Sequence, residues 1–154
     1  MANNSGKGTG FEYDVCQLFT EQNYFTRRSI PIRSTINQDI TDVDVLGIKY
    51  TYPFEKKVII CDCKNKVKPK PFERIFWTKG LGEYVGVDDE YIALPKIGPD
   101  IIEFARKSKV RVISQNELSN YKDKQIGYAD YQYYGKFMQR LEDKNTGDPQ
   151  VLHY

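Results

Sequence analysis

Residues 58–64 read Val-Ile-Ile-Cys-Asp-Cys-Lys, and this stretch decides how the rest of the sequence is interpreted. Its first three residues form a continuous apolar run, which is typical of a central strand covered on both faces. Side chains alternate between the two faces of a strand, so Asp62 and Lys64 share one face and Cys63 lies on the other. The stretch therefore predicts a buried strand that ends in a carboxylate and an ammonium group.

A second strand is predicted shortly before it, where residues 42–48 read Asp-Val-Asp-Val-Leu-Gly-Ile. Asp42 and Asp44 share one face of this strand, and we interpret Asp42 as a solvated neighbour. If the two strands are adjacent, the carboxylates of Asp44 and Asp62 approach closely. Two carboxylates about 4 Å apart repel by roughly 4 kcal/mol at an effective dielectric near 20. A divalent cation removes this penalty, and Mg²⁺ prefers such oxygen ligands.

These residues are chemically sufficient for phosphodiester hydrolysis. A bound metal ion acidifies a water molecule and stabilises the charge that develops on phosphorus. Lys64 would stabilise the same charge or orient the attacking water. The basic residues that follow are expected to contact phosphate, although a solvated lysine loop is the alternative for each of them: Lys66, Lys68, Lys70 and Arg74.

The predicted elements alternate between helices and strands along the chain. Helices are expected at 11–20, 72–80 and 100–107, and a turn of helix is expected to start at 116–118. Gly80, Gly82 and Gly86 interrupt the second helix, and its continuation towards Val85 is the alternative. Extended segments or strands are expected at 24–32, 43–50, 56–63, 90–94 and 110–114, with a break at Pro31. This alternation predicts an α/β domain around a mixed sheet.

The pattern of Asp44, a hairpin-sized gap and Asp62-Cys63-Lys64 resembles the PD-(D/E)xK nuclease superfamily, and Glu12 matches an acidic residue that many members carry on the first helix. Over roughly residues 10–118 the sequence resembles Mrr-like restriction endonucleases and archaeal Holliday-junction resolvases in particular. Val43 departs from the pattern, since proline is common at that position. The resemblance implies a restriction-endonuclease-like fold, with a mixed β-sheet flanked by helices in αβββαβ order. It also implies that Asp44 and Asp62 bind the metal, that Lys64 is catalytic, and that Glu12 acts on the metal or on water.

Length and composition set the frame for this hypothesis. The 154 residues carry a formal net charge of +2, with 40% hydrophobic and 29% charged residues, which predicts a globular chain. Three cysteines and a single histidine exclude a four-ligand zinc site and indicate a reduced, cytoplasmic protein. No stretch is apolar enough to span a membrane. We expect a flexible leader at 1–9, a nuclease domain at 10–118 and a tyrosine-rich C-terminal extension at 119–154.

The sequence thus predicts a Mg²⁺-dependent endonuclease that acts on DNA, with Mn²⁺ able to substitute. The alternative is a non-cleaving nucleic-acid-binding or dimerisation module on the same fold. A homodimer, and a fusion or partner domain for target recognition, are left open at this point.

Overall fold

The computed structural model describes residues 5–36, 38–64 and 70–124. The chain divides into two compact units, residues 1–121 and 122–154. The fold described below is that of the first unit. Most of the tyrosine-rich extension predicted for 119–154 lies outside the described residues.

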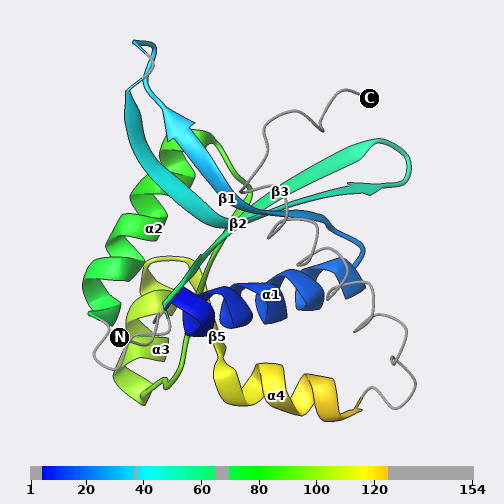
Figure 1. The fold of residues 1–154 in the computed structure, drawn as a ribbon, viewed down its shortest axis with the longest axis vertical. Coiled ribbons are helices and arrows are strands. Elements are labelled where there is room, and N and C mark those ends of the chain that lie inside the picture. The colour runs from blue at the N-terminus through cyan, green and yellow to red at the C-terminus, as the bar shows by residue number, and fades with distance from the viewer. Residues whose placement is uncertain (1–4, 37, 65–69, 125–154) are drawn as a thin grey trace. The chain divides into compact units, whose positions relative to one another are not determined.

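The first unit is built around one five-stranded mixed sheet, as predicted, and Figure 1 shows its elements in chain order. The first six elements follow the predicted αβββαβ order. The elements are α1 (Ser5–Glu21), β1 (Phe25–Arg33), β2 (Asp39–Thr51), β3 (Glu55–Cys63), α2 (Pro71–Val85), β4 (Asp89–Leu94), α3 (Pro99–Lys107), β5 (Val110–Ser114) and α4 (Gln115–Lys124).

The strands lie in the sheet in the same order as in the chain, β1-β2-β3-β4-β5. The first three form an antiparallel meander, whereas β3, β4 and β5 run parallel to one another. Parallel neighbours need a crossover connection, and α2 and α3 supply the two crossovers. As a result, the carboxyl ends of β3, β4 and β5 lie at the same end of the sheet.

Each face of the sheet is covered by its own apolar core. On one face α1 packs Phe11, Val15 and Phe19 against alternate residues of the strands, including Ile59 and Cys61, and Leu118 of α4 joins the same core. On the other face Ile75 of α2 and Ala105 of α3 pack with residues of β4 and β5, namely Ile92, Leu94 and Val110. Since β3 is buried on both faces, its apolar run is explained.

Several element boundaries differ from prediction. Helix α1 begins at Ser5 rather than at Phe11, so residues 5–9 of the expected leader are helical. Strand β1 runs through Pro31, which is compatible with a strand at the edge of a sheet because an edge position needs no outward N–H donor.

Helix α2 follows the longer of the two predicted alternatives, and helix α4 is longer than expected. Helix α2 continues through Gly80 and Gly82 to Val85 and ends at Gly86, whose left-handed backbone (φ 76°) closes the helix with a hydrogen bond from its N–H to the Gly82 carbonyl. Helix α4 is ten residues long, whereas a single turn was expected. Among the described helices, none combines the length and the apolar character needed to cross a membrane.

Candidate active site

Strands β2 and β3 separate where the acidic residues lie. Their antiparallel ladder runs from the Thr51–Glu55 pair at the hairpin to the Val45–Cys61 pair. Beyond that pair the Cys63 N–H donates to Asp44 Oδ2, at 2.7 Å, so a side chain takes the place of a main-chain acceptor. On its other side β3 stays attached to β4, since the Lys64 N–H donates to the Ala93 carbonyl at 3.0 Å. The Asp44 carboxylate is therefore fixed at the point where the ladder ends.

The Asp62 side chain lies on the opposite face of β3 from Cys61 and Cys63, toward α2. It is 4% exposed, and a carboxylate this buried is costly unless cations and hydrogen bonds compensate it. Arg74 of α2 supplies both: its Nε donates to Asp62 Oδ2 at 2.9 Å, and its Nη2 donates to Oδ1. The Lys64 ammonium also lies 3.1 Å from Oδ1. Both oxygens of Asp62 are thus bound by cationic groups.

Lys64 joins the two carboxylates. Its Nζ lies 3.0 Å from Asp44 Oδ2 and 3.1 Å from Asp62 Oδ1, so acids from neighbouring strands converge on a single nitrogen. The structure therefore brings together the three residues singled out in the sequence. The Lys64 and Asp44 side chains are 24% and 18% exposed, which leaves this side of the cluster within reach of solvent.

Burial and charge shift the proton affinities of this cluster. Burial raises the pKa of Asp44, and the neighbouring Asp62 raises it further, while the Cys63 N–H and Lys64 act in the opposite direction. For Lys64 burial works against the charged form, but the attraction of Asp62 and Asp44 outweighs it and raises the pKa. The ammonium group therefore stays charged while it holds the two carboxylates together.

Glu12 lies at the edge of the cluster on helix α1. Its Oε2 pairs with Arg28 Nη1 at 3.6 Å, and the Arg28 guanidinium lies over the Tyr13 ring at 3.5 Å. Burial raises the pKa of Glu12, and the negative charge of Asp44 raises it too. Glu12 is therefore close enough to feel the charge of Asp44, but its own ion pair is with Arg28 and not with Lys64.

The basic residues predicted to contact phosphate have different settings. Lys66 and Lys68 lie outside the described residues. Lys70 is exposed at the start of α2 and pairs with Glu73 at 2.9 Å. Arg74 is turned inward onto Asp62, with its guanidinium stacked on Trp77 at 4.2 Å.

The contact between Arg74 and Asp62 was not predicted from the sequence. The two residues are twelve positions apart on different elements, and which side chain of α2 reaches β3 depends on the rotation of the helix about its axis. Trp77 of the same helix lines a small hollow with Asp44 and Asp62. The one available signal was the position of an arginine in the first turn of the helix that follows the motif.

The residues present are compatible with magnesium in ligand type. Across residues 5–36, 38–64 and 70–124 no group of three or more His, Cys, Asp or Glu side chains is arranged to hold a metal ion. Two carboxylates do converge, and Mg²⁺ usually takes one or two carboxylates from a protein and completes its shell with water and phosphate oxygens. Because Arg74 and Lys64 bind both oxygens of Asp62, a metal ion would have to displace at least one of these contacts.

Comparison with known proteins adds support for the fold. No protein-family model matches the chain, and no curated protein is significantly similar to it. Among solved structures, the chain is similar to one described as "Crystal Structure of Protein of Unknown Function AF1548", with a TM-score of 0.52 and 15% sequence identity. The match covers 73% of this chain and 65% of the other, so this chain spans less than two thirds of the length of that protein. At this level of identity the likeness concerns the fold alone.

Proposed function

We propose that the chain is a Mg²⁺-dependent endonuclease of the PD-(D/E)xK type that hydrolyses phosphodiester bonds in DNA. The observation that carries the proposal is the convergence of the Asp44 and Asp62 carboxylates, from two adjacent strands, on the Lys64 ammonium group. Carboxylates and a lysine held together at a strand end, with one side near solvent, are what metal-assisted phosphodiester hydrolysis requires.

Each residue of the cluster has a separate role in this proposal. Asp44 and Asp62 would hold Mg²⁺ or Mn²⁺, with Glu12 assisting at the edge. The bound ion supplies an acidified water molecule and offsets charge at phosphorus. Lys64, already charged and near solvent, would bind a phosphate oxygen or orient the water. Arg74, once released from Asp62, has a planar guanidinium that matches phosphate in shape.

The same proposal covers the partner and the compartment. DNA would be the partner, with Lys66, Lys68 and Lys70 as proposed phosphate contacts. Such contacts are expected to make binding strongly dependent on salt. The three cysteines are free and buried, which is in keeping with the proposed cytoplasmic location.

Plasmid nicking by matched aspartate variants tests the proposal. Asp44→Ala removes a carboxylate that contacts Lys64, whereas Asp42→Ala removes an exposed carboxylate two residues away on the same strand. Supercoiled plasmid with Mg²⁺ should be nicked by the wild type and by Asp42→Ala, but not by Asp44→Ala, and EDTA should stop the reaction. Equal nicking by both variants would show that the activity does not come from this cluster, and the proposal would be rejected.

A non-cleaving DNA-binding or dimerisation module is the second candidate. The full pairing of Asp62 with Arg74 and Lys64 favours it, because the carboxylate is neutralised without any metal ion. This candidate predicts salt-sensitive DNA binding that needs no metal ion and no nicking by any variant. Fluorescence anisotropy with labelled duplex DNA, with and without EDTA, separates the two candidates, and light scattering reports any homodimer.

A further inference from the structure

The two edges of the sheet differ in how well they could accept another strand. The β1 edge is interrupted: Pro31 has no N–H to donate, Ser29 has a left-handed backbone (φ 51°), and the register with β2 shifts between Ile32 and Arg33. Irregular backbone and proline are the devices by which proteins prevent pairing at an exposed edge. The β1 edge is therefore protected.

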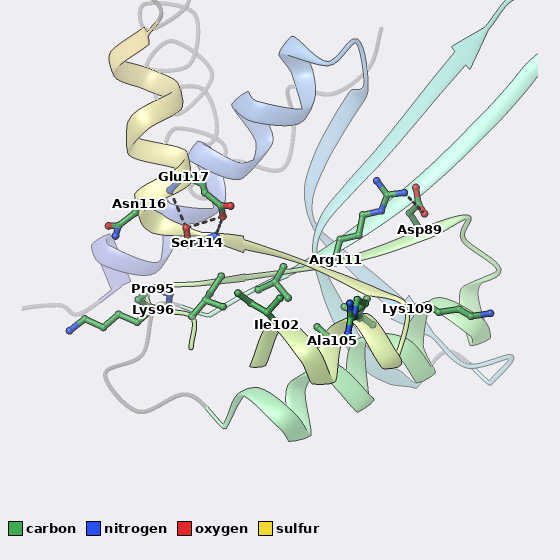
Figure 2. Close-up of a pocket in the computed structure, with 14 residues that line it drawn as sticks. Asp89, Pro95, Lys96, Ile102, Ala105, Lys109, Arg111, Ser114, Asn116 and Glu117 are labelled. Carbon is green, nitrogen blue, oxygen red and sulfur yellow. Dashed lines mark hydrogen bonds and ion pairs between the residues drawn. The ribbon is translucent and has the colours of Figure 1, made fainter. Parts of the chain in front are cut away.

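The β5 edge has none of these interruptions. Val110–Ser114 pairs with β4 in one continuous parallel register and contains neither proline nor glycine. Within the part of the chain that the structure describes, β5 has no strand on its other side. Instead, a groove of about 790 Å³ follows this edge, with Ile102 and Ala105 of α3 beside it, as Figure 2 shows.

The lining of the groove is aliphatic with a positive rim. Ile97, Ile102 and Val112 supply apolar surface, and Ile102 is 55% exposed. The cationic side chains that line the groove are Lys96, Arg106, Lys109 and Arg111.

The acidic residues of the lining are already engaged. Asp89 pairs with Lys57 at 2.6 Å and with Arg111 at 3.4 Å. Glu117 caps the start of α4 by accepting the Ser114 N–H at 2.7 Å. Among the described residues Lys96, Arg106 and Lys109 form no ion pair with an acidic partner, so the groove carries uncompensated positive charge.

We propose that the β5 edge binds an extended, acidic segment of a partner protein, which adds to the sheet as a sixth strand. The main chain of β5 would supply hydrogen bonds, and the aliphatic surface would receive every second side chain of the segment. Acidic side chains of the segment would pair with Lys96 and Arg106. This proposal is independent of nuclease activity, because it uses none of the residues of the acidic cluster.

The lining favours a peptide over a nucleic acid. Among the residues that the structure describes, no aromatic side chain lines the groove, whereas sites for single-stranded nucleic acid stack bases on aromatic rings. A nucleic acid strand would also leave the hydrogen-bonding groups of the β5 edge unused. The cations of the rim could attract either polymer, but a peptide strand satisfies the rim, the aliphatic surface and the strand edge together.

The probe is a fluorescein-labelled peptide of alternating glutamate and valine. Its binding to the full chain is followed by fluorescence anisotropy. The wild type should bind it, and Lys96→Glu combined with Arg106→Glu should weaken binding by about tenfold through lost charge pairs. The matched control is Arg27→Glu combined with Lys56→Glu, two cations on other strands, which should bind like the wild type. Thermal melts of both variants establish that the fold is intact.

Further probes test two points: whether the main chain of the peptide contributes to binding, and whether the groove binds a nucleic acid instead. Methylation of alternate main-chain nitrogens along one edge of the peptide should abolish binding, whereas methylation along the other edge should not. A peptide of alternating lysine and valine should bind much more weakly. Equal binding of the two peptides, no effect of the charge reversal, or no binding at roughly millimolar peptide would overturn the proposal. Binding of oligo-dT in place of the acidic peptide would also overturn it, if the wild type binds oligo-dT and the charge-reversed variant does not.

Discussion

Asp62 and Glu90 are both carboxylates buried against helix α2, and each is 4% exposed, yet their surroundings differ. Glu90, near the start of β4, is held by Lys79, whose Nζ lies 2.9 Å from Oε1 and also 2.9 Å from the exposed Glu83. Asp62, near the end of β3, shares Lys64 with a second carboxylate, Asp44. Burial with a cationic partner is therefore common to both sites. At both sites the lysine also contacts a second carboxylate. Beside Glu90 this is Glu83, which is 71% exposed and lies on the same helix as Lys79, whereas beside Asp62 it is Asp44, which is 18% exposed and lies on the adjacent strand. A second, partly buried carboxylate held at the strand end is what separates a candidate catalytic group from a structural ion pair.

The largest expected effect concerns cleavage. Asp62→Asn should lower the rate of plasmid nicking by about 10³-fold, because several kcal/mol of metal-assisted stabilisation would be lost. Glu90→Gln should leave the rate within about threefold of the wild type, since Glu90 contacts no residue of the cluster. Initial rates with Mg²⁺ measure both. A similar loss in both variants would mean that nicking follows the integrity of the fold, and the distinction between the two acids would fail.

The free energy of unfolding should depend strongly on Lys79, the partner of Glu90. Lys79→Met leaves the buried Glu90 carboxylate without its lysine, and we expect the free energy of unfolding to fall by about 3 kcal/mol. Lys70→Met removes a lysine whose pair with Glu73 is exposed, at 75% and 68%, and should change the free energy by less than about 0.5 kcal/mol. Urea denaturation followed by circular dichroism gives both values. An equal effect of the two substitutions would contradict a structural role for the buried pair.

Divalent cations should stabilise one of the two sites selectively. Mn²⁺ or Mg²⁺ in about tenfold excess over its Kd should raise the melting temperature of the wild type by roughly 4 °C, and EDTA should reverse the shift. Glu90→Gln should show the same shift, whereas Asp62→Asn should show none. Differential scanning fluorimetry at several metal concentrations makes the measurement. A shift that persists in Asp62→Asn would place the metal ion elsewhere.

The smallest effects concern two glycines of helix α2. A Cβ at Gly82 would lie 2.8 Å from Glu90 Cδ and closer still to its Cγ, and the Glu90 side chain is buried and paired. Gly82→Ala should therefore lower the free energy of unfolding by about 1–2 kcal/mol. Gly80→Ala, with nothing within 4 Å of its Cβ, should raise it by up to about 1 kcal/mol through better helix propensity. Urea midpoints that move in the same direction would show that Glu90 yields to the added methyl group.

Sequence patterns with a short period predicted most of the fold and the centre of the site. The two-residue alternation of Asp62 and Lys64, and the apolar run before them, depend on strand geometry, which does not change with tertiary context. The meeting of Asp44 with Asp62 followed from one hairpin. These are local relationships, and the structure contains each of them.

The contacts that helix α2 makes with the sheet could not be predicted from the sequence. Nothing in the sequence specified that Arg74 rather than Lys70 turns toward Asp62, because that choice depends on how α2 rotates as it packs. Gly80 and Gly82 left the end of α2 open between Gly80 and Val85, since glycine disfavours helix by about 1 kcal/mol at each position. Close approach of α2 to Glu90 requires a residue without a side chain at position 82, so tertiary packing outweighed the local preference.

The consecutive order of the strands has a consequence for synthesis on the ribosome. Each strand neighbours the one made just before it, so the sheet can extend by one strand at a time as the chain emerges. Asp44, Asp62, Lys64 and Arg74 all fall within one stretch of 31 residues, numbered 44–74. Asp44, Asp62 and Lys64 can therefore meet once the β2–β3 hairpin has formed, whereas Arg74 takes its place when β4 and β5 supply the core against which α2 packs. Among the described strands, β5 is the last to join the sheet.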